Sequence, residues 1–461
     1  MTYSKIVKNV IFPAAQLLLG GRSLEYINEW ERTQWLPPSE LRALQLRKLR
    51  AMLAHCAASV PYYRDEFRRV GFRPEDVASL ADLKRLPVLD KSILRAHSSS
   101  FIAEGITEKL YIAKTGGSTG EPLSFPIGAS LRACSTANMV RCRRWWGIDV
   151  GDPSANFWGH SRTVRSRPLD PLRKSLSTFK GRLLNRIVCS AYDLSDSALH
   201  SYWRRVDRFR PSFLIGYATS LYVFADFVLR HNLDGPSLRL KAVISTAEVL
   251  YDWQAETIRR AFASPVVNEY GMCEAGIIAY QCPSGSMHAM DESVIVEILP
   301  IDGSPSGEIV ITELENVAAP LIRYNTKDVA SAVGAPCPCG RGLSTISNVE
   351  GRAYDLIYAS NGKIVAGARL THLMKSTPGV AQYQILQRDL THLDISFTEY
   401  SPVSESDLAS VTRTLKNHLG DGVDIKLERV SALPKDLSGK HRWLRSLIRP
   451  EDLRPRKEPP L

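Results

Sequence analysis

Two groups of residues in this chain of 461 residues have the types and spacing to do chemistry. The first is a short run of glycine and hydroxyl residues, Thr115 to Gly120, which follows an apolar stretch. Such loops turn tightly and point N–H and O–H donors inward, which suits a phosphate group. A Walker loop needs Lys and then Ser or Thr after its last glycine, whereas Gly120 precedes Glu121 and Pro122. A phosphate loop of another kind and a plain surface loop both stay open on these residues alone.

The second group combines three cysteines with one histidine. Cys282 and His288 are followed by Cys337 and Cys339, on either side of a β-rich stretch. Three thiolates and one imidazole are the ligands of a closed, tetrahedral structural Zn²⁺ site. The spacing is not that of a common zinc finger, so the alternative is a set of free buried thiols. We expect a structural zinc site over the region 282–339.

Short apolar runs that alternate with helical patterns must position these groups. The runs 213–218, 241–246 and 264–271 lie between longer helical stretches, which is the pattern of an α/β fold with a parallel sheet. Residues 292–313 form two β-rich runs around a turn and predict a hairpin. After residue 351 the pattern restarts as a smaller unit. The sequence therefore predicts an N-terminal domain over 1–351 and a C-terminal domain over 352–461.

Three further stretches predict helices or surfaces. Residues 36–56 carry a broad apolar face after two prolines, Pro37 and Pro38, which predicts a helix with Ser39 as its N-cap. The runs 141–147 and 202–210 mix arginines with aromatic residues. They are interpreted either as nucleic-acid platforms or, as we favour, as amphipathic helices with their charges in water.

Composition limits the kinds of molecule that this chain can be expected to bind. The chain is 44% hydrophobic and 23% charged, which is typical of a soluble globular protein, and its net charge of +11 favours anionic partners. The apolar stretch 10–21 follows Lys5 and Lys8 and is interrupted by Pro13, so it is too short for a membrane-spanning helix. A signal peptide, an interfacial anchor and a segment docked on the core are the alternatives, and we favour the last. A cytoplasmic location and no nucleic-acid partner are expected.

Six motifs occur in a fixed order over most of the chain. They are "TGGSTGEP" (115–122), "STAE" (245–248), "NEYGMCEAG" (268–276), "LIRYNTKDVA" (321–330), "GRAYDLI" (351–357) and "LPKDLSGKHR" (433–442). This order resembles the adenylate-forming ligase superfamily. Two N-terminal segments, "PYYRDEF" (61–67) and "LKRLPVLDKSILR" (83–95), resemble its phenylacetate-CoA ligase branch. "NGKIV" (361–365) and "YQILQ" (383–387) resemble the ligase-like proteins of capsule and polysaccharide synthesis.

The resemblance implies a large α/β adenylation domain, a smaller mobile α+β C-terminal domain and a two-step reaction. ATP and a carboxylic acid give an acyl-AMP and pyrophosphate, and the acyl group then passes to CoA. Transfer to an amine or a sugar is the alternative, and a non-catalytic scaffold is a third reading. The implied cofactors are ATP, Mg²⁺, CoA and the structural Zn²⁺, and the partners are a small carboxylate and its acyl acceptor. Residues 213–218 and 245–251 are expected to shape the acid pocket.

The resemblance also implies roles for single residues. Lys440 would bridge the substrate carboxylate and the α-phosphate, Glu274 would hold Mg²⁺, and Asp355 would be the hinge. Asp328 would bind the ribose, and Arg352 the ribose and phosphate, with catalytic assignment to Lys440, Glu274 and Arg352. The motifs depart from the family pattern at Cys273, Asn325 and Lys327. The full set expected at the nucleotide is Thr115, Gly116, Gly117, Ser118, Thr119, Gly120, Thr246, Ala247, Glu248, Glu269, Tyr270, Gly271, Asp328 and Arg352.

Overall fold

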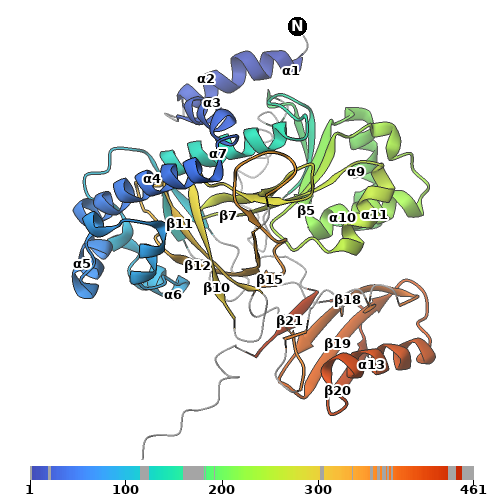
Figure 1. The fold of residues 1–461 in the computed structure, drawn as a ribbon. Helices are drawn as coiled ribbons and strands as arrows, with labels where there is room; N and C mark the ends of the chain where they lie inside the picture. Colours follow the sequence, from blue (N-terminus) through green and yellow to red (C-terminus); the bar gives the residue numbers. More distant parts are fainter. Residues whose placement is uncertain are drawn as a thin grey trace, which may run out of the picture. The chain divides into compact units, whose positions relative to one another are not determined.

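A computed structural model gives the fold of the chain (Figure 1). It describes residues 3–18, 22–114, 124–158, 181, 183–191, 193–301, 306–334, 336–352, 357–360, 364–365, 370, 373–374, 377–433 and 443–448. The chain divides into two compact units. The first comprises Met1–Ile298, Ile309–Thr326 and Ser331–Asn348, and the second comprises Leu299–Glu308, Lys327–Ala330 and Val349–Leu461. The predicted α/β class, with a large unit and a smaller one, is confirmed.

The first unit begins with helices and short helical turns. They are α1 (Tyr3–Ile6), η1 (Val7–Ile11), α2 (Phe12–Leu18), α3 (Ser23–Thr33), α4 (Pro38–Ser59), α5 (Pro61–Val70), η2 (Pro74–Asp76), η3 (Leu80–Arg85), α6 (Lys91–Ala96) and η4 (Ser98–Phe101). The helix predicted over 36–56 is α4, but Ser39 is not its N-cap. The cap position is Pro37, which makes no side-chain cap, and Pro38 is the first helical residue. Proline suits that position because its missing N–H has no helical partner there.

A nine-stranded sheet forms the centre of this unit. Its order is β13 (Ala332–Val333), β14 (Thr345–Ile346), β9 (Met287–Ala289), β8 (Gly276–Gln281), β7 (Val266–Met272), β6 (Ala242–Thr246), β5 (Phe213–Tyr217), β3 (Ser154–Trp158) and β4 (Arg186–Ser190). Strands β4, β3, β5, β6 and β7 pair in parallel, whereas the remaining pairs are antiparallel. The three apolar runs of the sequence form β5, β6 and β7, as predicted.

Helices cover both faces of the parallel strands. On one face, Leu214 and Val243 pack in a buried core with α9 (Asp196–Phe209), α10 (Ala218–Arg230) and α11 (Asp252–Phe262). Neighbouring residues of a strand point to opposite faces. Phe213, next to Leu214, lies under the guanidinium of Arg143, at 5.2 Å from the ring centroid. Helix α7 (Ala129–Arg144) therefore covers the other face.

The basic run 141–147 is not the solvated helix that we favoured from the sequence. Arg141 is fully buried, and its Nη1 lies 2.6 Å from Oε1 of Glu292. It also donates to Oδ1 of Asn138 at 3.0 Å and lies over the ring of Trp30. The run 202–210 differs, because it belongs to α9 and buries only Tyr202 and Val206, as an amphipathic helix does.

The described residues up to 352 also form two smaller sheets and a short 3₁₀ turn, η5 (Pro236–Leu238). Strand β1 (Leu110–Lys114) pairs antiparallel with β2 (Ser124–Gly128). A four-stranded sheet has the order β10 (Val294–Pro300), β11 (Gly307–Glu313), β12 (Tyr324–Ala330) and β15 (Gly351–Arg352). The neighbouring strands β10 and β11 are the two arms of the hairpin predicted over 292–313.

The second unit has a small α+β core. Its sheet has the order β20 (Asp424–Arg429), β19 (His392–Glu399), β18 (Val380–Gln387) and β21 (Leu444–Ser446). Helix α13 (Glu405–Leu419) contributes Val411 and Leu415 to the buried residues, and Ser404 caps its first turn by accepting from Asp407 N at 3.1 Å. A two-stranded ladder joins β16 (Ile357–Tyr358) to β17 (Ile364–Val365).

Candidate functional site

The carboxyl ends of the parallel strands gather several of the predicted residues. Thr246 ends β6, and it is paired with Tyr217 on β5 and with Glu269 on β7. Ligands of open α/β sheets bind outside these ends, at the point where successive connections run in opposite directions. The order β4-β3-β5-β6 places that point between β3 and β5. The sheet thus brings Thr246 and Glu269 to the edge where a ligand is expected.

An aromatic pair stands at this switch point. Trp158 ends β3 and Tyr217 ends β5, and their ring centroids are 5.0 Å apart. Tyr217 is buried, whereas Trp158 is 38% exposed. Tyr217 lies in the stretch 213–218 that we expected to shape the acid pocket. Trp158 was missed, because a tryptophan that ends an apolar run looks like an ordinary core residue in the sequence.

The segment after β6 is held by a helix terminus. Ala247 has a φ of 66°, a left-handed conformation that redirects the chain at the end of the strand. Oε2 of Glu248 accepts a hydrogen bond of 2.8 Å from Thr219 N, in the first turn of α10. A carboxylate at a helix N-terminus satisfies a free N–H and the positive end of the helix dipole. Glu248 therefore holds this segment in place, which is a structural role in addition to the nucleotide contact expected from the sequence.

Glu274 lies in the tight turn between β7 and β8. Gly276 has a φ of 71°, and a Cβ there would come within 2.8 Å of the Ser135 Cβ. A Cβ on Gly271 would come within 2.5 Å of the Gly276 carbonyl oxygen. The turn leaves Cys273 exposed and buries Glu274 to 5% exposure. The glycines of the motif thus shape a turn that encloses one carboxylate.

A second buried carboxylate interacts with Glu274. Burial raises the pKa of Glu313 on β11 to about 8, and the charge of Glu274 adds to the rise. Oε2 of Glu313 accepts from Asn316 Nδ2 and from Leu321 N, each at 2.9 Å. Sequence reasoning missed Glu313, since a single acid at the end of a strand carries no spacing signal.

Tyr270 and Glu269 precede that turn on β7. The hydroxyl of Tyr270 donates to Thr326 Oγ1 at 3.3 Å, and Thr326 donates in turn to the Ile309 carbonyl at 3.0 Å. Burial raises the pKa of Glu269, although Arg143 and the hydroxyl of Thr246 oppose the rise. The motif residues of β7 are therefore fixed by polar contacts within the first unit.

Strand β12 carries Asp328, which pairs with Arg352 on β15. The fold thus places the backbones of these two predicted residues opposite each other. Between Thr326 and Asp328, Lys327 has a φ of 64°, a conformation that favours glycine. Its Nζ lies 3.3 Å from both carboxylate oxygens of Glu308. Lys327, one of the positions at which the motif departs from the family pattern, thus has a backbone that glycine would adopt more easily.

Several predicted residues lie outside the described part of the chain. They are the loop Thr115 to Gly120, the hinge residue Asp355, the side chain of Arg352 and Lys440. The strands that flank the loop pair up to Lys114 and Ser124.

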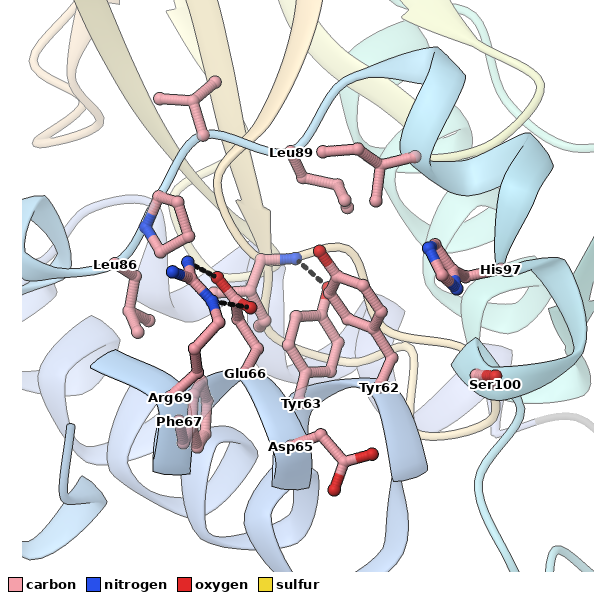
Figure 2. Close-up of a pocket in the computed structure, with 14 residues that line it drawn as sticks. Tyr62, Tyr63, Asp65, Glu66, Phe67, Arg69, Leu86, Leu89, His97 and Ser100 are labelled. Carbon is pink, nitrogen blue, oxygen red and sulfur yellow. Dashed lines mark hydrogen bonds and ion pairs between the residues drawn. The ribbon is translucent and has the colours of Figure 1, made fainter. Parts of the chain in front are cut away.

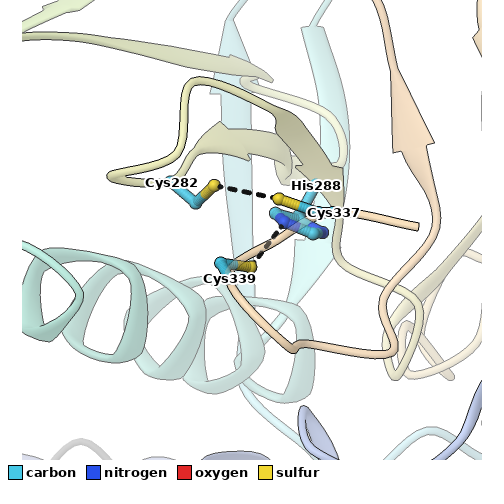
Figure 3. A group of neighbouring side chains, drawn as sticks. All are labelled: Cys282, His288, Cys337 and Cys339. Carbon is cyan, nitrogen blue, oxygen red and sulfur yellow. Dashed lines mark hydrogen bonds between the residues drawn. The ribbon is translucent and has the colours of Figure 1, made fainter. Parts of the chain in front are cut away.

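The four predicted zinc ligands come together (Figure 3). Their ligand atoms all lie within 4.8 Å of one another. The Sγ atoms of Cys282 and Cys337 are 3.6 Å apart, and Cys339 Sγ is 3.2 Å from His288 Nε2. Zinc–sulfur bonds of about 2.3 Å in a tetrahedron separate two sulfurs by about 3.8 Å, so the geometry suits zinc.

The surroundings of the cluster suit a metal as well. The Nδ1 of His288 lies 3.1 Å from the carbonyl oxygen of Leu343. Because that oxygen can only accept, Nδ1 carries the proton of the neutral ring, and the lone pair of Nε2 points to the cysteines. Burial lowers the pKa of His288, which favours the neutral, ligating imidazole. Burial raises the pKa of Cys282 to about 11. For Cys337 burial acts in the same direction, but hydrogen bonds from Ser286 and Cys339 outweigh it and lower the pKa.

A separate pocket of about 490 Å³ lies beside α5 (Figure 2). Arg69 donates to both carboxylate oxygens of Glu66 at one side, at 2.8 and 2.6 Å. The other lining residues include Tyr62, Phe67, Leu86, Leu89, Ile93 and His97. Among the predicted nucleotide and catalytic residues that the structure describes, none lines it. The segments 61–67 and 83–95, which pointed to the phenylacetate-CoA ligase branch, form most of its wall.

Comparisons with known proteins agree with the motifs. Residues 357–446 match the CapK C-terminal domain family. The chain is 22% identical to protein CapK of Staphylococcus aureus over 410 residues, which cover 88% of this chain and 89% of CapK. It is 26% identical to phenylacetate-coenzyme A ligase of Aromatoleum evansii over 375 residues, which cover 77% and 80% of the two chains. The resemblance to both groups is confirmed.

A solved structure shares the fold along most of the chain. The crystal structure of 2-hydroxyisobutyryl-CoA ligase in the postadenylation state matches with a TM-score of 0.70 at 19% identity, over 90% of this chain and 91% of that one. The chain therefore shares the fold of that ligase.

Proposed function

We propose that this protein is an AMP-forming acid ligase, which activates a carboxylic acid with ATP as an acyl-AMP, releases pyrophosphate, and transfers the acyl group to CoA. The observation that carries the proposal is the turn after β7, which buries Glu274 beside the carboxyl ends of β6 and β7. Similarity to phenylacetate-coenzyme A ligases over about four fifths of the chain supports the acyl-CoA chemistry.

The reaction brings several anions together, so the residues of the site would bind or neutralise negative charge. Glu274 would hold Mg²⁺, a hard cation that takes oxygen ligands and would neutralise phosphate charge. Thr115 to Gly120 would contact the β- and γ-phosphates, and Asp328 would bind the ribose. Lys440 would place its ammonium between the substrate carboxylate and the α-phosphate, where negative charge builds in the transition state.

The acid would lie against the aromatic pair at the switch point. Trp158 offers an exposed indole face, and Tyr217 backs it from the neighbouring strand. Such a wall favours an acid with an apolar or aromatic part over a small polar acid.

Domain alternation forms part of the proposal. Residues 352–461 would rotate at Asp355, so that Lys440 reaches the acid during adenylation and leaves before the transfer step. A second candidate keeps the acyl-AMP step but passes the acyl group to an amine or a sugar in surface polysaccharide synthesis, as the resemblance carried by residues 361–365 and 383–387 implies.

The four-residue cluster would bind one structural Zn²⁺. Its closed set of three sulfurs and one nitrogen leaves no open position for a substrate, so the metal would stabilise the fold. Elemental analysis of protein never exposed to a chelator should find about one zinc per chain. Cys339→Ser should lower the zinc content and the melting temperature, whereas Cys189→Ser, in a buried site away from the cluster, should keep the zinc. Protein without zinc would refute the assignment.

Pyrophosphate release tests the main proposal. The protein is mixed with ATP, Mg²⁺ and a panel of aryl, fatty, amino and sugar acids, with and without CoA, and each acid is omitted in turn as the control. Acid-dependent release, followed by an acyl-CoA product in the presence of CoA, is expected. Acid-dependent release with no thioester, but with product from an amine or sugar, would favour the second candidate. No release with any acid would contradict both.

A further inference from the structure

The helical run from Tyr3 to Leu18, which we call the N-terminal helix, has an exposed apolar stripe. It comprises α1, η1 and α2 without a break. Tyr3, Ile6, Val10 and Leu17 are exposed to 44%, 37%, 59% and 78%. Their spacings of three, four and seven residues place them along one side of a helix. Ordinary surface helices bury such a stripe in the core, so this one is arranged for contact with something else.

Other side chains of the N-terminal helix attach it to the first unit. Val7 is 1% exposed, and Phe12 packs against the buried cluster that contains Tyr26 and Trp30. Lys8 forms an ion pair of 2.6 Å with Asp149. Figure 1 shows α1 and α2 on the outside of this unit, above α7. Val7, Phe12 and Lys8 therefore attach the helix to the first unit, whereas Ile6, Val10 and Leu17 stay exposed.

The charge around the stripe is positive. Lys5 is exposed, Lys8 keeps 45% of its side chain exposed, and the first acid in the sequence is Glu25. The Tyr3 hydroxyl donates to the Leu183 carbonyl at 3.0 Å. Leu183 and Leu184 are 39% and 36% exposed, so they extend the apolar surface beside Tyr3. The helix itself carries no acid, and although Lys8 pairs with Asp149, Lys5 stays exposed beside the apolar side chains. Apolar side chains beside an exposed lysine complement an anionic, apolar layer.

We propose that the N-terminal helix binds the surface of an anionic lipid bilayer and lies in the plane of the interface. Its 16 residues extend about 24 Å. Across the described part of the chain, no helix is long and apolar enough to cross a membrane. A docked amphipathic helix with basic residues is the form in which proteins lie on such surfaces. Four side chains in a line are also few compared with the about 20 to 30 residues per side of a stable protein interface.

Vesicle flotation of the full chain tests the proposal. Vesicles of phosphatidylcholine with about one third phosphatidylglycerol are compared with vesicles of phosphatidylcholine alone. The protein should float with the anionic vesicles, and added salt should weaken the binding because it screens the lysines. Val10→Asp with Leu17→Asp should reduce binding at least tenfold, and Lys5→Glu should reduce it severalfold. The matched control is Val333→Asp, which changes a side chain of similar exposure, 43%, and should bind as the unchanged protein does.

Hydrogen exchange on the unchanged protein gives a second readout that needs no variant. Anionic vesicles should slow exchange of the amides in residues 3–18 and leave α10 unaffected. No flotation, equal flotation of the double variant, or protection only outside residues 3–18 would each overturn the proposal. Analytical sedimentation without lipid tests whether a second copy of the chain, and not a bilayer, covers the N-terminal helix. A dimer that Leu17→Asp dissociates would also overturn the proposal.

Discussion

We predict that Glu313 makes the stability of the protein depend on pH, because its carboxyl is buried and its pKa is raised to about 8 from an ordinary 4.5. Between these two values the folded protein keeps the proton that the unfolded chain has lost. The folded state then binds more protons than the unfolded state, so the free energy of unfolding falls as pH rises through this window. Below pH 4.5 both states are protonated, and the effect vanishes.

The size follows from the pKa difference. A difference of about 3.5 units corresponds to about 5 kcal/mol over the whole window, at about 1.4 kcal/mol per pH unit. Glu313→Gln keeps an oxygen for Asn316 Nδ2 and Leu321 N but cannot ionise. Relative to this variant, the unchanged protein should therefore lose about 3 kcal/mol between pH 5.5 and pH 8.

Urea unfolding at four pH values between these limits measures the difference. Glu256→Gln, at a position on α11 whose side chain is 57% exposed, is the matched control and should leave the pH dependence unchanged. A constant difference between the Glu313→Gln variant and the unchanged protein would show that Glu313 is ionised throughout, and would refute the reasoning from burial.

Four other changes test the site. Glu274→Gln should lower Mg²⁺-dependent pyrophosphate release about 10²-fold with an unchanged melting curve, and unchanged release would remove Glu274 from the site. Lys440→Ala should slow adenylation about 10²- to 10³-fold yet convert supplied acyl-AMP and acceptor at near the normal rate; equal loss in both steps would contradict domain alternation. Trp158→Ala should raise KM for the acid about tenfold and leave KM for ATP unchanged, with Trp35→Ala as the control. Lys327→Gly should keep or raise the free energy of unfolding by up to about 1 kcal/mol, because glycine relieves the left-handed backbone while a long ion pair whose lysine is 44% exposed adds little; a clear loss of stability would contradict this.

The sequence predicted the central strands because buried parallel strands are continuous apolar runs, as 213–218 and 241–246 are. It predicted that Cys282, His288, Cys337 and Cys339 come together, because cysteine and histidine have few other reasons to group. What brings the two halves of the cluster together is the pairing of β14 with β9, in which Thr345 lies opposite His288. That pairing joins segments more than fifty residues apart, which no local pattern contains.

Long-range partners also explain what the sequence did not predict. Arg141 belongs to a basic run that looks solvated, and its partner Glu292 is 151 residues away. A charge becomes a core residue only when the fold supplies its counter-ion and hydrogen bonds. Glu313 is the converse case, because burial without a cation leaves a carboxylate protonated. For both Arg141 and Glu313, the sequence gives the residue type but not the environment that the fold creates around it.

The segments 61–67 and 83–95, which resemble the phenylacetate-CoA ligase branch, form hydrogen bonds to the chain between Pro320 and Asn325. Tyr63 Oη donates to the Pro320 carbonyl and accepts from Ile322 N, each at 2.9 Å. Leu89 N donates to the Arg323 carbonyl at 2.9 Å, and Asn325 N donates back to the Leu89 carbonyl at 2.8 Å.

These bonds fasten the start of β12, the strand that continues to Asp328. Arg323 strengthens the attachment by donating to the Leu86 carbonyl and by pairing with both carboxylate oxygens of Glu297, at 3.0 and 3.1 Å. Because β12 is short, a shift at its start would move every residue after it along the strand. The N-terminal segments therefore hold the start of β12 in place, and under the proposed function they would act on ribose binding through this strand, without touching the nucleotide.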